Sequence, residues 1–417
     1  MSKKTFSVLS LGCFRNTYDS EVAARRLVDQ GYAFKEDCSN CDTLVINTCG
    51  FISQAKEESL EVIQSAVDLK KKGKIRKLVV FGCLIQRYKE HLVKEFPEVD
   101  QWLGVEKFNS KNNRRLKITP SHIDFLKVCE GCIHNCSYCA IPLIKGPLKS
   151  RGIKDIINEV EYLDSTGIKE LNLIGQDITS WGRDIGYKDG ISVLLEKILK
   201  KVKKIQWIRL IYTHPRNVSD RLISIIASDR RVCKYIDLPI QHISDKILKL
   251  MKRRFSRKQT EALIEKIRKN IPGCVIRTSV ITGFPAESEE EFKELYHFLK
   301  LTKFERLGAF TYSKEEETKA AKLIPQVHYK TKIRRYKKIM ELQQDISREV
   351  NRRFLSKEID VLVEEKSGGF YIGRTQYDAY EVDGVVFVGG ENLRIGEIYP
   401  ARIIDSHEYD LTAEVIK

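Results

Sequence analysis

Three short apolar segments near the N-terminus, each ended by a cysteine and each followed by a helix-like segment, constrain the fold most strongly. The strand-like segments are 6–12, 43–48 and 78–82, and the cysteines are Cys13, Cys49 and Cys83. Helix signals follow from Asp19, where Asp-Ser-Glu marks a helix start, and then over 54–72 and about 87–96. Strands that alternate with helices imply a parallel sheet. We therefore expect an N-terminal doubly wound parallel α/β domain.

These three cysteines share one topological position, the carboxyl end of a strand. Ligands on open parallel sheets bind outside the carboxyl ends of the strands, so one crevice would gather all three thiols. A single cysteine at a strand end is usually a small buried hydrophobic residue, whereas three in the same position indicate a metal cluster. Cys38 and Cys41 form a C-x-x-C pair at the opposite end of the second strand, and we expect them to be unliganded.

A second group of three cysteines lies in the middle of the chain. Cys132, Cys136 and Cys139 follow the spacing C-x-x-x-C-x-x-C, so one loop can wrap three thiolates around a single inorganic centre. Iron–sulfur clusters are held by Cys thiolates, normally four per cubane, and three would leave one iron open to a substrate or cofactor. The alternative is structural zinc, which requires a closed tetrahedral set. The nearest further ligand, His134, is crowded between two of the cysteines.

From residue 125 to about residue 313, strand-like and helix-like segments alternate again. The expected strands are 171–175, 207–212, 235–240, 275–281 and 306–312, and the expected helices lie near 155–164, 191–203, 218–228, 257–270 and 289–301. An open or closed barrel of parallel strands satisfies this pattern, and such barrels carry their function at the carboxyl ends of the strands.

Polar residues follow several of these strands, where a cofactor would lie. They are Gly175, Gln176 and Asp177, then Gln241 and His242, and then Gly283. An ordinary turn accounts for each of them equally well. We expect His214 and His242 to be hydrogen-bonded structural residues, and Cys233 and Cys274 to be core thiols.

The remaining segments differ in composition and in their pattern of apolar residues. Residues 106–120 are polar and without apolar periodicity, which is typical of a linker, and residues 323–350 form a charged, helix-prone connector. Short alternating strands separated by glycine turns follow at 359–363, 369–372, 385–388 and 398–404. This pattern predicts a small all-β barrel at the C-terminus.

Charge is unevenly distributed in this chain of 417 residues with a formal net charge of +16. Residues 351–417 contain eight Lys and Arg against thirteen Asp and Glu, a balance of −5 that leaves +21 on residues 1–350. A basic body fits a partner rich in RNA, and a solvated basic surface is the alternative. No run of about 18 apolar residues exists, so we expect no membrane span. Eleven cysteines without a secretory leader indicate a reducing, cytoplasmic environment.

The central cysteine loop, with Tyr138 before its last cysteine, resembles that of the radical S-adenosylmethionine enzymes, and the residues after it resemble the methylthiotransferase branch. The segments that carry the second resemblance are Ile141-Pro142, Lys145-Gly146, Lys149-Ser150-Arg151, Leu11-Gly12-Cys13-Phe14-Arg15-Asn16, Asn47-Thr48-Cys49-Gly50-Phe51-Ile52 and Gly82-Cys83-Leu84-Ile85-Gln86-Arg87-Tyr88. The segment 373–384 resembles a TRAM domain. Among methylthiotransferases the chain is most similar to the RimO type, which modifies an aspartate of ribosomal protein S-twelve.

The resemblance implies a fold, cofactors and roles for particular residues. It implies residues 1–117 as a methylthiotransferase N-terminal domain, 118–350 as a partial (β/α)6 TIM-like radical barrel with its connector helix, and 351–417 as an OB-like TRAM domain. Cys132, Cys136 and Cys139 would hold the radical-generating 4Fe–4S cluster, and Cys13, Cys49 and Cys83 an auxiliary 4Fe–4S cluster that carries the sulfur. S-adenosylmethionine would bind near Tyr138, Gly175, Gln176, Asp177, Gln241 and Gly283.

The expected activity is methylthiolation of the aspartate β-carbon in S-twelve, with two S-adenosylmethionine molecules and a reductant such as a flavodoxin or ferredoxin. The sulfur donor is unknown. A tRNA adenosine methylthiotransferase is the nearest alternative, although the acidic C-terminal segment speaks against RNA as its ligand. A non-enzymatic iron–sulfur or zinc protein bound to ribosomes is the alternative from a different class. We expect Asp378, Glu381 and Asp383 to attract a basic loop of the substrate.

Overall fold

The computed structural model describes residues 3–105 and 114–416, and the chain divides into two compact units. The first unit comprises residues 1–119, 130–133 and 139–151, and the second comprises 120–129, 134–138 and 152–417. Most of the expected linker, residues 106–113, lies outside the described residues. No helix of the described ranges is long and apolar enough to cross a membrane.

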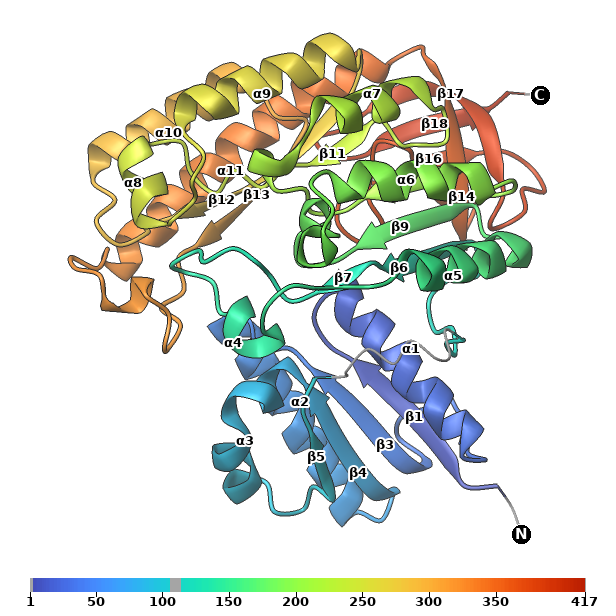
Figure 1. Ribbon diagram of the computed structural model, residues 1–417. Coiled ribbons are helices and arrows are strands. Elements are labelled where there is room, and N and C mark those ends of the chain that lie inside the picture. Colours follow the sequence, from blue (N-terminus) through green and yellow to red (C-terminus); the bar gives the residue numbers. More distant parts are fainter. Residues whose placement is uncertain (1–2, 106–113, 417) are drawn as a thin grey trace. The chain divides into compact units, whose positions relative to one another are not determined.

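The first unit is built on a five-stranded parallel sheet in the order β2-β1-β3-β4-β5 (Figure 1). Its elements are β1 (Thr5–Ser10), α1 (Phe14–Asp29), β2 (Ala33–Phe34), β3 (Cys41–Thr48), α2 (Ser53–Lys71), β4 (Ile75–Gly82), α3 (Cys83–Glu95) and β5 (Gln101–Leu103). Because side chains alternate along a strand, β3 contributes apolar side chains to both faces of the sheet. Leu44 and Ile46 pack with α2 and α3, whereas Val45 packs with α1. The expected doubly wound sheet is confirmed.

Two helices of this unit begin earlier than the sequence indicated. α1 begins at Phe14 rather than Asp19, and α3 begins at Cys83 rather than about Arg87. Neither helix has a side-chain cap at its N-terminus, so the usual start signal is missing. Asp19 and its neighbour Glu21 are instead buried inside α1, where Glu21 accepts backbone hydrogen bonds from residues 118 and 119.

The second unit contains a partial barrel of six parallel strands. They are β6 (Ile123–Lys127), β9 (Glu170–Ile174), β10 (Trp207–Leu210), β11 (Tyr235–Asp237), β12 (Val275–Thr282) and β13 (Arg306–Thr311). The strands pair as β10-β9-β6 and β11-β12-β13. Backbone hydrogen bonds from Thr213 to Asp237 and from Cys233 to Ile208 join the two sets. The expected partial (β/α)6 barrel is therefore confirmed.

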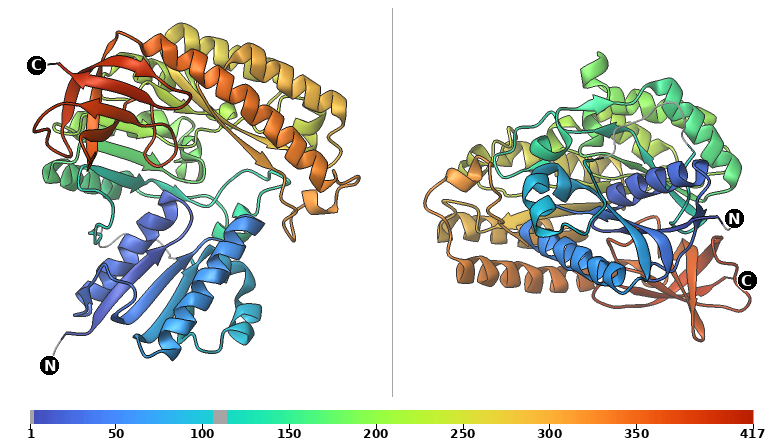
Figure 2. Two further views of the ribbon diagram at one scale, coloured as in Figure 1. Left: turned by 180° about the vertical axis from the view of Figure 1, so that it is seen from behind. Right: turned by 90° about the horizontal axis from the view of Figure 1, so that it is seen from below.

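Helices cover the outside of this barrel (Figure 1). They are α5 (Ile153–Thr166), α6 (Gly190–Lys201), α7 (Asp220–Ser228), α8 (Asp245–Leu250), α9 (Arg257–Asn270), α10 (Glu289–Thr302) and the connector α11 (Tyr329–Asn351). The sequence did not indicate α8, which is only six residues long. Figure 2 shows α11 as a long orange helix, and it packs on α10, β12 and β13.

The C-terminal segment forms a closed barrel in the order β14-β15-β16-β18-β17. Its strands are β14 (Glu358–Ser367), β15 (Phe370–Thr375), β16 (Val386–Gly389), β17 (Ile398–Ser406) and β18 (Leu411–Val415). β18 was not expected, but it closes the barrel by pairing with β16 and β17. Closure leaves no free sheet edge, as the all-β prediction required.

Buried ion pairs fix this closed barrel to the amino ends of the partial barrel. Glu170, the first residue of β9, accepts a hydrogen bond of 2.7 Å from Arg374, and both side chains are almost completely buried. Arg306, the first residue of β13, binds Asp378 at 2.7 Å. Charges buried in this way are tolerated only when paired. Residues 134–138 of the central cysteine loop lie at the opposite, carboxyl ends of the strands.

Candidate functional site

The first cysteine group lies at the carboxyl edge of the five-stranded sheet, as expected. Cys13 precedes α1, Cys49 directly follows β3, and Cys83 is the first residue of α3. Strand register brings these ends level, because Ser10 pairs with Asn47 and the next residue of β3, Thr48, pairs with Gly82. Parallel pairing alone therefore collects the three thiols at one edge.

Glycines beside these cysteines allow the strand ends to approach closely. Gly12 has φ +88°, and a Cβ placed on it would lie 3.0 Å from the Cys49 sulfur. Gly82 has φ +109°, and a Cβ there would lie 2.7 Å from the Thr48 carbonyl oxygen. Only glycine fits both the left-handed backbone and the space. The cysteine edge is thus a cradle that an added methyl group would disrupt, and its donor set of three thiols suits an iron–sulfur cluster.

The three thiols of this edge differ in their electrostatic surroundings. Burial raises the pKa of Cys49, and it raises the pKa of Cys83 to about 12. Burial acts in the same direction on Cys13, but the Arg15 guanidinium outweighs it and lowers the pKa of that thiol. Lys145, which directly precedes Gly146, also favours the thiolate of Cys83. Arg15 at Cys13 and Lys145 at Cys83 favour the deprotonated form that binds metals.

The central cysteine loop is anchored to the barrel through His134. Its Nε2 lies 2.8 Å from the carboxylate of Asp177, the third residue after β9, and its ring stacks on His214 with the centroids 3.9 Å apart. Asp177 also accepts hydrogen bonds from Ser180 and Asn217. Burial holds the pKa of His214 down to about 2. His214 is therefore the structural residue that the sequence predicted, and His134 is one as well.

Further anchors hold the loop on both sides of Cys136. The Ser137 amide donates to the Met251 carbonyl at 3.0 Å, and the Ser137 carbonyl accepts from Ala320 at 2.8 Å. Tyr138 packs edge-on against Phe284 with the ring centroids 6.5 Å apart. These contacts fix residues 134–138 at the carboxyl ends of the strands.

Arg253 is a site residue that sequence reasoning missed. Its side chain is buried and donates to the Pro239 carbonyl at 2.5 Å, near Tyr138 and Cys136. Burial disfavours its charge, but Tyr138 and Cys136 outweigh burial and raise its pKa. In the sequence it stands in the run Lys252-Arg253-Arg254, which carries no signal that separates it from surface charges.

The polar residues expected to contact a cofactor do lie at strand ends. Gln176 is 6% exposed, and its Oε1 has no hydrogen-bond partner among the described residues. Gln241 is buried and has φ +70°, and Tyr212 after β10 has φ +65°. Non-glycine residues in this left-handed region are strained and cluster at functional sites. The neighbouring Gly283 donates its amide to Glu287 at 2.9 Å.

The other predicted cysteines are also placed. Cys132 and Cys139 belong to the first unit and Cys136 to the second. Cys41 opens β3, at the end of that strand opposite Cys49, and Cys233 and Cys274 are buried core thiols as predicted. Among the described residues, no three His, Cys, Asp or Glu side chains surround a point where a single metal ion would bind.

The acidic segment of the closed barrel does not form the docking surface that the sequence suggested. Asp378 is 2% exposed and binds Arg306. Asp383 accepts a hydrogen bond from Tyr235 at 2.7 Å and lies 3.4 Å from Arg277. Only Glu381 faces solvent. The first two carboxylates neutralise arginines of the partial barrel, so they are unavailable to a substrate.

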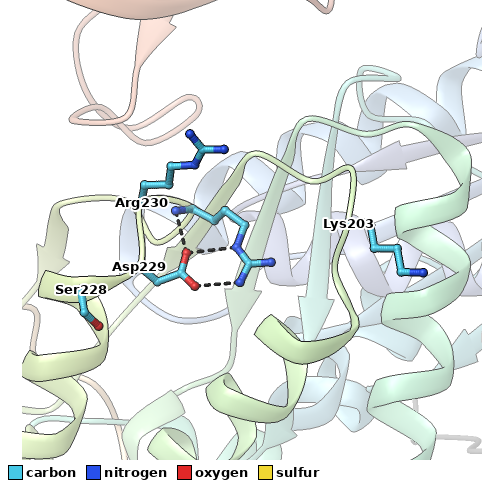
Figure 3. Close-up of a pocket in the computed structure, with 5 residues that line it drawn as sticks. Lys203, Ser228, Asp229 and Arg230 are labelled. Atoms are coloured by element: carbon cyan, nitrogen blue, oxygen red, sulfur yellow. Dashed lines mark hydrogen bonds and ion pairs between the residues drawn. The ribbon is translucent and has the colours of Figure 1, made fainter.

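A surface pocket lies at the other end of the partial barrel (Figure 3). Lys203, Ser228, Asp229, Arg230 and Arg231 line it. Asp229 and Arg231 neutralise each other through two hydrogen bonds of 3.0 and 2.7 Å. These residues lie just before β10 and β11, at the amino ends of the strands, away from the polar strand ends described above.

Models of three protein families match successive parts of the chain. The uncharacterized protein family UPF0004 matches residues 5–104, the radical SAM superfamily matches 126–299, and the TRAM domain matches 357–416. The chain is also similar in fold to a radical S-adenosylmethionine methyltransferase, TsrM from Kitasatospora setae, with a TM-score of 0.52 and 14% identity over 75% of each chain. At that identity the likeness shows the fold alone.

Curated relatives are similar over nearly the full length. The ribosomal protein uS12 methylthiotransferase RimO of Caldicellulosiruptor saccharolyticus is 44% identical over 437 residues, covering 98% of this chain and 99% of that protein. The protein of the same name from Desulforamulus reducens is 42% identical over 441 residues, covering 99% of both.

Proposed function

The chain belongs to the ribosomal protein uS12 methylthiotransferase family, and on that basis we propose that it attaches a methylthio group to the β-carbon of an aspartate in this ribosomal protein. The observation that carries the proposal is the 44% identity over 98% of the chain and 99% of the relative. The enzyme is a radical S-adenosylmethionine transferase that uses 4Fe–4S clusters.

Three parts of the chain divide the work. We assign residues 1–117 to the auxiliary cluster, 118–350 to radical generation, and 351–417 to a TRAM domain. Each part contains one of the three matched family models, and the closed C-terminal barrel supports the last assignment.

The target carbon explains why a radical is needed. An aliphatic β-carbon bears no proton that His, Lys or a carboxylate could remove, so general base catalysis fails. Cys132, Cys136 and Cys139 would hold a 4Fe–4S cluster, which would supply the electron for radical cleavage of S-adenosylmethionine. Cys13, Cys49 and Cys83 would hold a second cluster, which would supply the sulfur of the methylthio group.

Residues of the barrel orient the cofactor. The Gln176 amide oxygen is buried without a partner, so an amino group of S-adenosylmethionine would satisfy it. The anchors at His134 and Ser137 hold the cysteine loop in one position. Tyr138 packs edge-on against the buried Phe284 at the strand ends. Gly175, Gln241 and Gly283 complete the proposed cofactor site, whereas Asp177 is committed to holding the loop.

The class of reductant and the cellular compartment follow from this chemistry. We propose a one-electron carrier such as a flavodoxin or ferredoxin as the reductant, because a cluster accepts single electrons. Since the proposed substrate is a ribosomal protein, the activity belongs in the cytoplasm.

Mass spectrometry of uS12 tests the proposal. A host that lacks its own uS12 methylthiotransferase should gain one methylthio group on a uS12 aspartate when this chain is expressed. The Cys136→Ala and Cys49→Ala variants should each leave uS12 unmodified. Methylthiolated adenosine in tRNA, with unmodified uS12, would instead establish the tRNA activity.

A further inference from the structure

A strongly basic segment lies just after the partial barrel. Residues 319–338 contain eight Lys and Arg and no Asp or Glu. Three of the eight have partners: Lys332 donates to the Tyr312 carbonyl, Arg334 binds Glu289, and Arg335 is buried against Glu287. The other five are exposed lysines that form no ion pair with a described carboxylate. They are Lys319, Lys322, Lys330, Lys337 and Lys338.

Two further cations stand beside this segment. Lys252 and Arg254, which follow α8, are both exposed. The positive charge of Lys319 lowers the pKa of Lys252, and Arg254 acts in the same direction. These like charges repel each other in the free protein. A polyanion that bound here would relieve the repulsion and release counterions.

The position of this basic group is set by the central cysteine loop. Ala320, next to Lys319, donates its amide to the Ser137 carbonyl at 2.8 Å. Met251, next to Lys252, accepts from the Ser137 amide at 3.0 Å. The cations therefore flank the residue that follows Cys136, at the same end of the partial barrel as the polar strand ends. Lys319 and Lys322 precede α11, Lys330 is its second residue, and Lys252 and Arg254 follow α8; Figure 1 labels both helices.

Apolar side chains are interleaved with these cations. Tyr329, the first residue of α11, is 70% exposed, and Ile324 is 86% exposed. An exposed aromatic ring among lysines is the combination that binds nucleic acid, since a base can stack on the ring while the lysines contact phosphates. A purely acidic protein partner would use the lysines but not the ring.

We propose that Lys252, Arg254, Lys319, Lys322 and Lys330 form a basic rim that docks on the phosphate backbone of ribosomal RNA beside the target aspartate. The inference rests on the proposed function, because a ribosomal protein in an assembled subunit is surrounded by RNA. It assigns RNA contact to the radical barrel rather than to the acidic TRAM segment. It also makes the assembled small subunit a better substrate than free uS12.

Charge reversal tests the basic rim. The test variant carries Lys319→Glu, Lys322→Glu and Lys330→Glu in the full, iron-loaded chain. A matched control carries the same charge change at three exposed lysines toward the amino ends of the barrel strands, and these are Lys197, Lys200 and Lys204. Binding to purified small subunits and to protein-free ribosomal RNA is measured across a salt series. Formation of 5′-deoxyadenosine and modification of free uS12 report an intact active site.

We expect the rim variant to bind subunits and ribosomal RNA about a hundredfold more weakly at about 0.1 M salt. The reason is that each lost phosphate contact reduces the slope of log binding constant against log salt concentration by about 0.7–0.9. The slope should therefore fall by about 2–3, while the control variant stays near wild type. Both variants should modify free uS12 equally well.

Three results would overturn the basic rim. In the first, the rim variant binds subunits as tightly as the control variant does. In the second, its binding keeps the wild-type salt slope. In the third, it loses modification of free uS12 as well as binding to subunits, which would indicate a contact with the protein. If wild type modifies uS12 in no form, the proposed function fails, and the binding series still decides whether the rim contacts RNA.

Discussion

Lys145 offers a test of how the auxiliary cysteine edge is held. Its ammonium is 4% exposed and lies 3.1 Å from Asp19 and 2.8 Å from Glu130, which are 7% and 9% exposed. Both carboxylates pull the pKa of Lys145 above its usual value against the opposing effect of burial. Its neighbour Ile144 packs against Cys83. The charge therefore compensates two buried carboxylates beside a cluster ligand.

Lys145→Met removes this compensation and nearly preserves the volume of the side chain. Breaking a buried ion pair from one side costs about 3–5 kcal/mol, because the buried carboxylates lose the compensating charge of Lys145. Each 1.4 kcal/mol changes the equilibrium constant for opening of this unit about tenfold. Amides of β3 and β4 that exchange only when the unit opens should therefore exchange with solvent about a hundred to several thousand times faster. The variant should also retain less iron at the auxiliary site.

Hydrogen exchange of the β3 and β4 amides measures the effect in the full chain. Lys145→Arg keeps the positive charge and should lose much less protection. Adding Asp19→Asn and Glu130→Gln to Lys145→Met should restore more than half of the loss, since neither side chain then carries a buried charge. Exchange in Lys145→Met within about threefold of wild type would refute the reasoning.

Three further predictions concern the clusters and the TRAM junction. Anaerobically reconstituted protein should hold about eight irons, as two cubanes require, and replacing all three cysteines of the central loop should remove about half; bound zinc would contradict this. Cys136→Ala should abolish 5′-deoxyadenosine formation, whereas Cys49→Ala should keep it and lose sulfur transfer, and methylthio transfer by the second variant would show the assignment to be wrong. Although burial opposes it, Arg209 and Arg374 lower the pKa of Glu170 from 4.5 to about 2. The ionised Glu170 therefore stabilises the folded junction fully above about pH 4.5, and this contribution is lost as the pH falls toward 2. Arg374→Met should shift acid release of the closed barrel, followed by limited proteolysis, to higher pH, and an unchanged midpoint would exclude that role.

Patterns repeated along the chain were predictable from the sequence. Cys13, Cys49 and Cys83 each end an apolar segment, and parallel pairing then places all three at one sheet edge. The central cysteine spacing and the strand–helix alternation were equally local signals. Helix starts at Phe14 and Cys83 were missed because no capping side chain marks them.

Tertiary neighbours decided what the sequence could not. The sequence suggested that Asp378 and Asp383 form a surface cluster. Their partners, Arg306 and Arg277, come from strands about 70 to 110 residues earlier, so no local pattern shows that these carboxylates are paired and buried. Arg253 lies between two exposed cations in sequence, and only the fold turns it toward Cys136. A charge in a charged run gives no sign of its own burial.

Isotope transfer tests the central claim most directly. Small subunits that contain uS12 with deuterium on the β-carbons of its aspartates are incubated with the reduced enzyme and S-adenosylmethionine. The account predicts deuterium in the 5′-deoxyadenosine that is released, together with a methylthio group on the same aspartate. Modified uS12 with 5′-deoxyadenosine free of deuterium would contradict radical abstraction at that carbon.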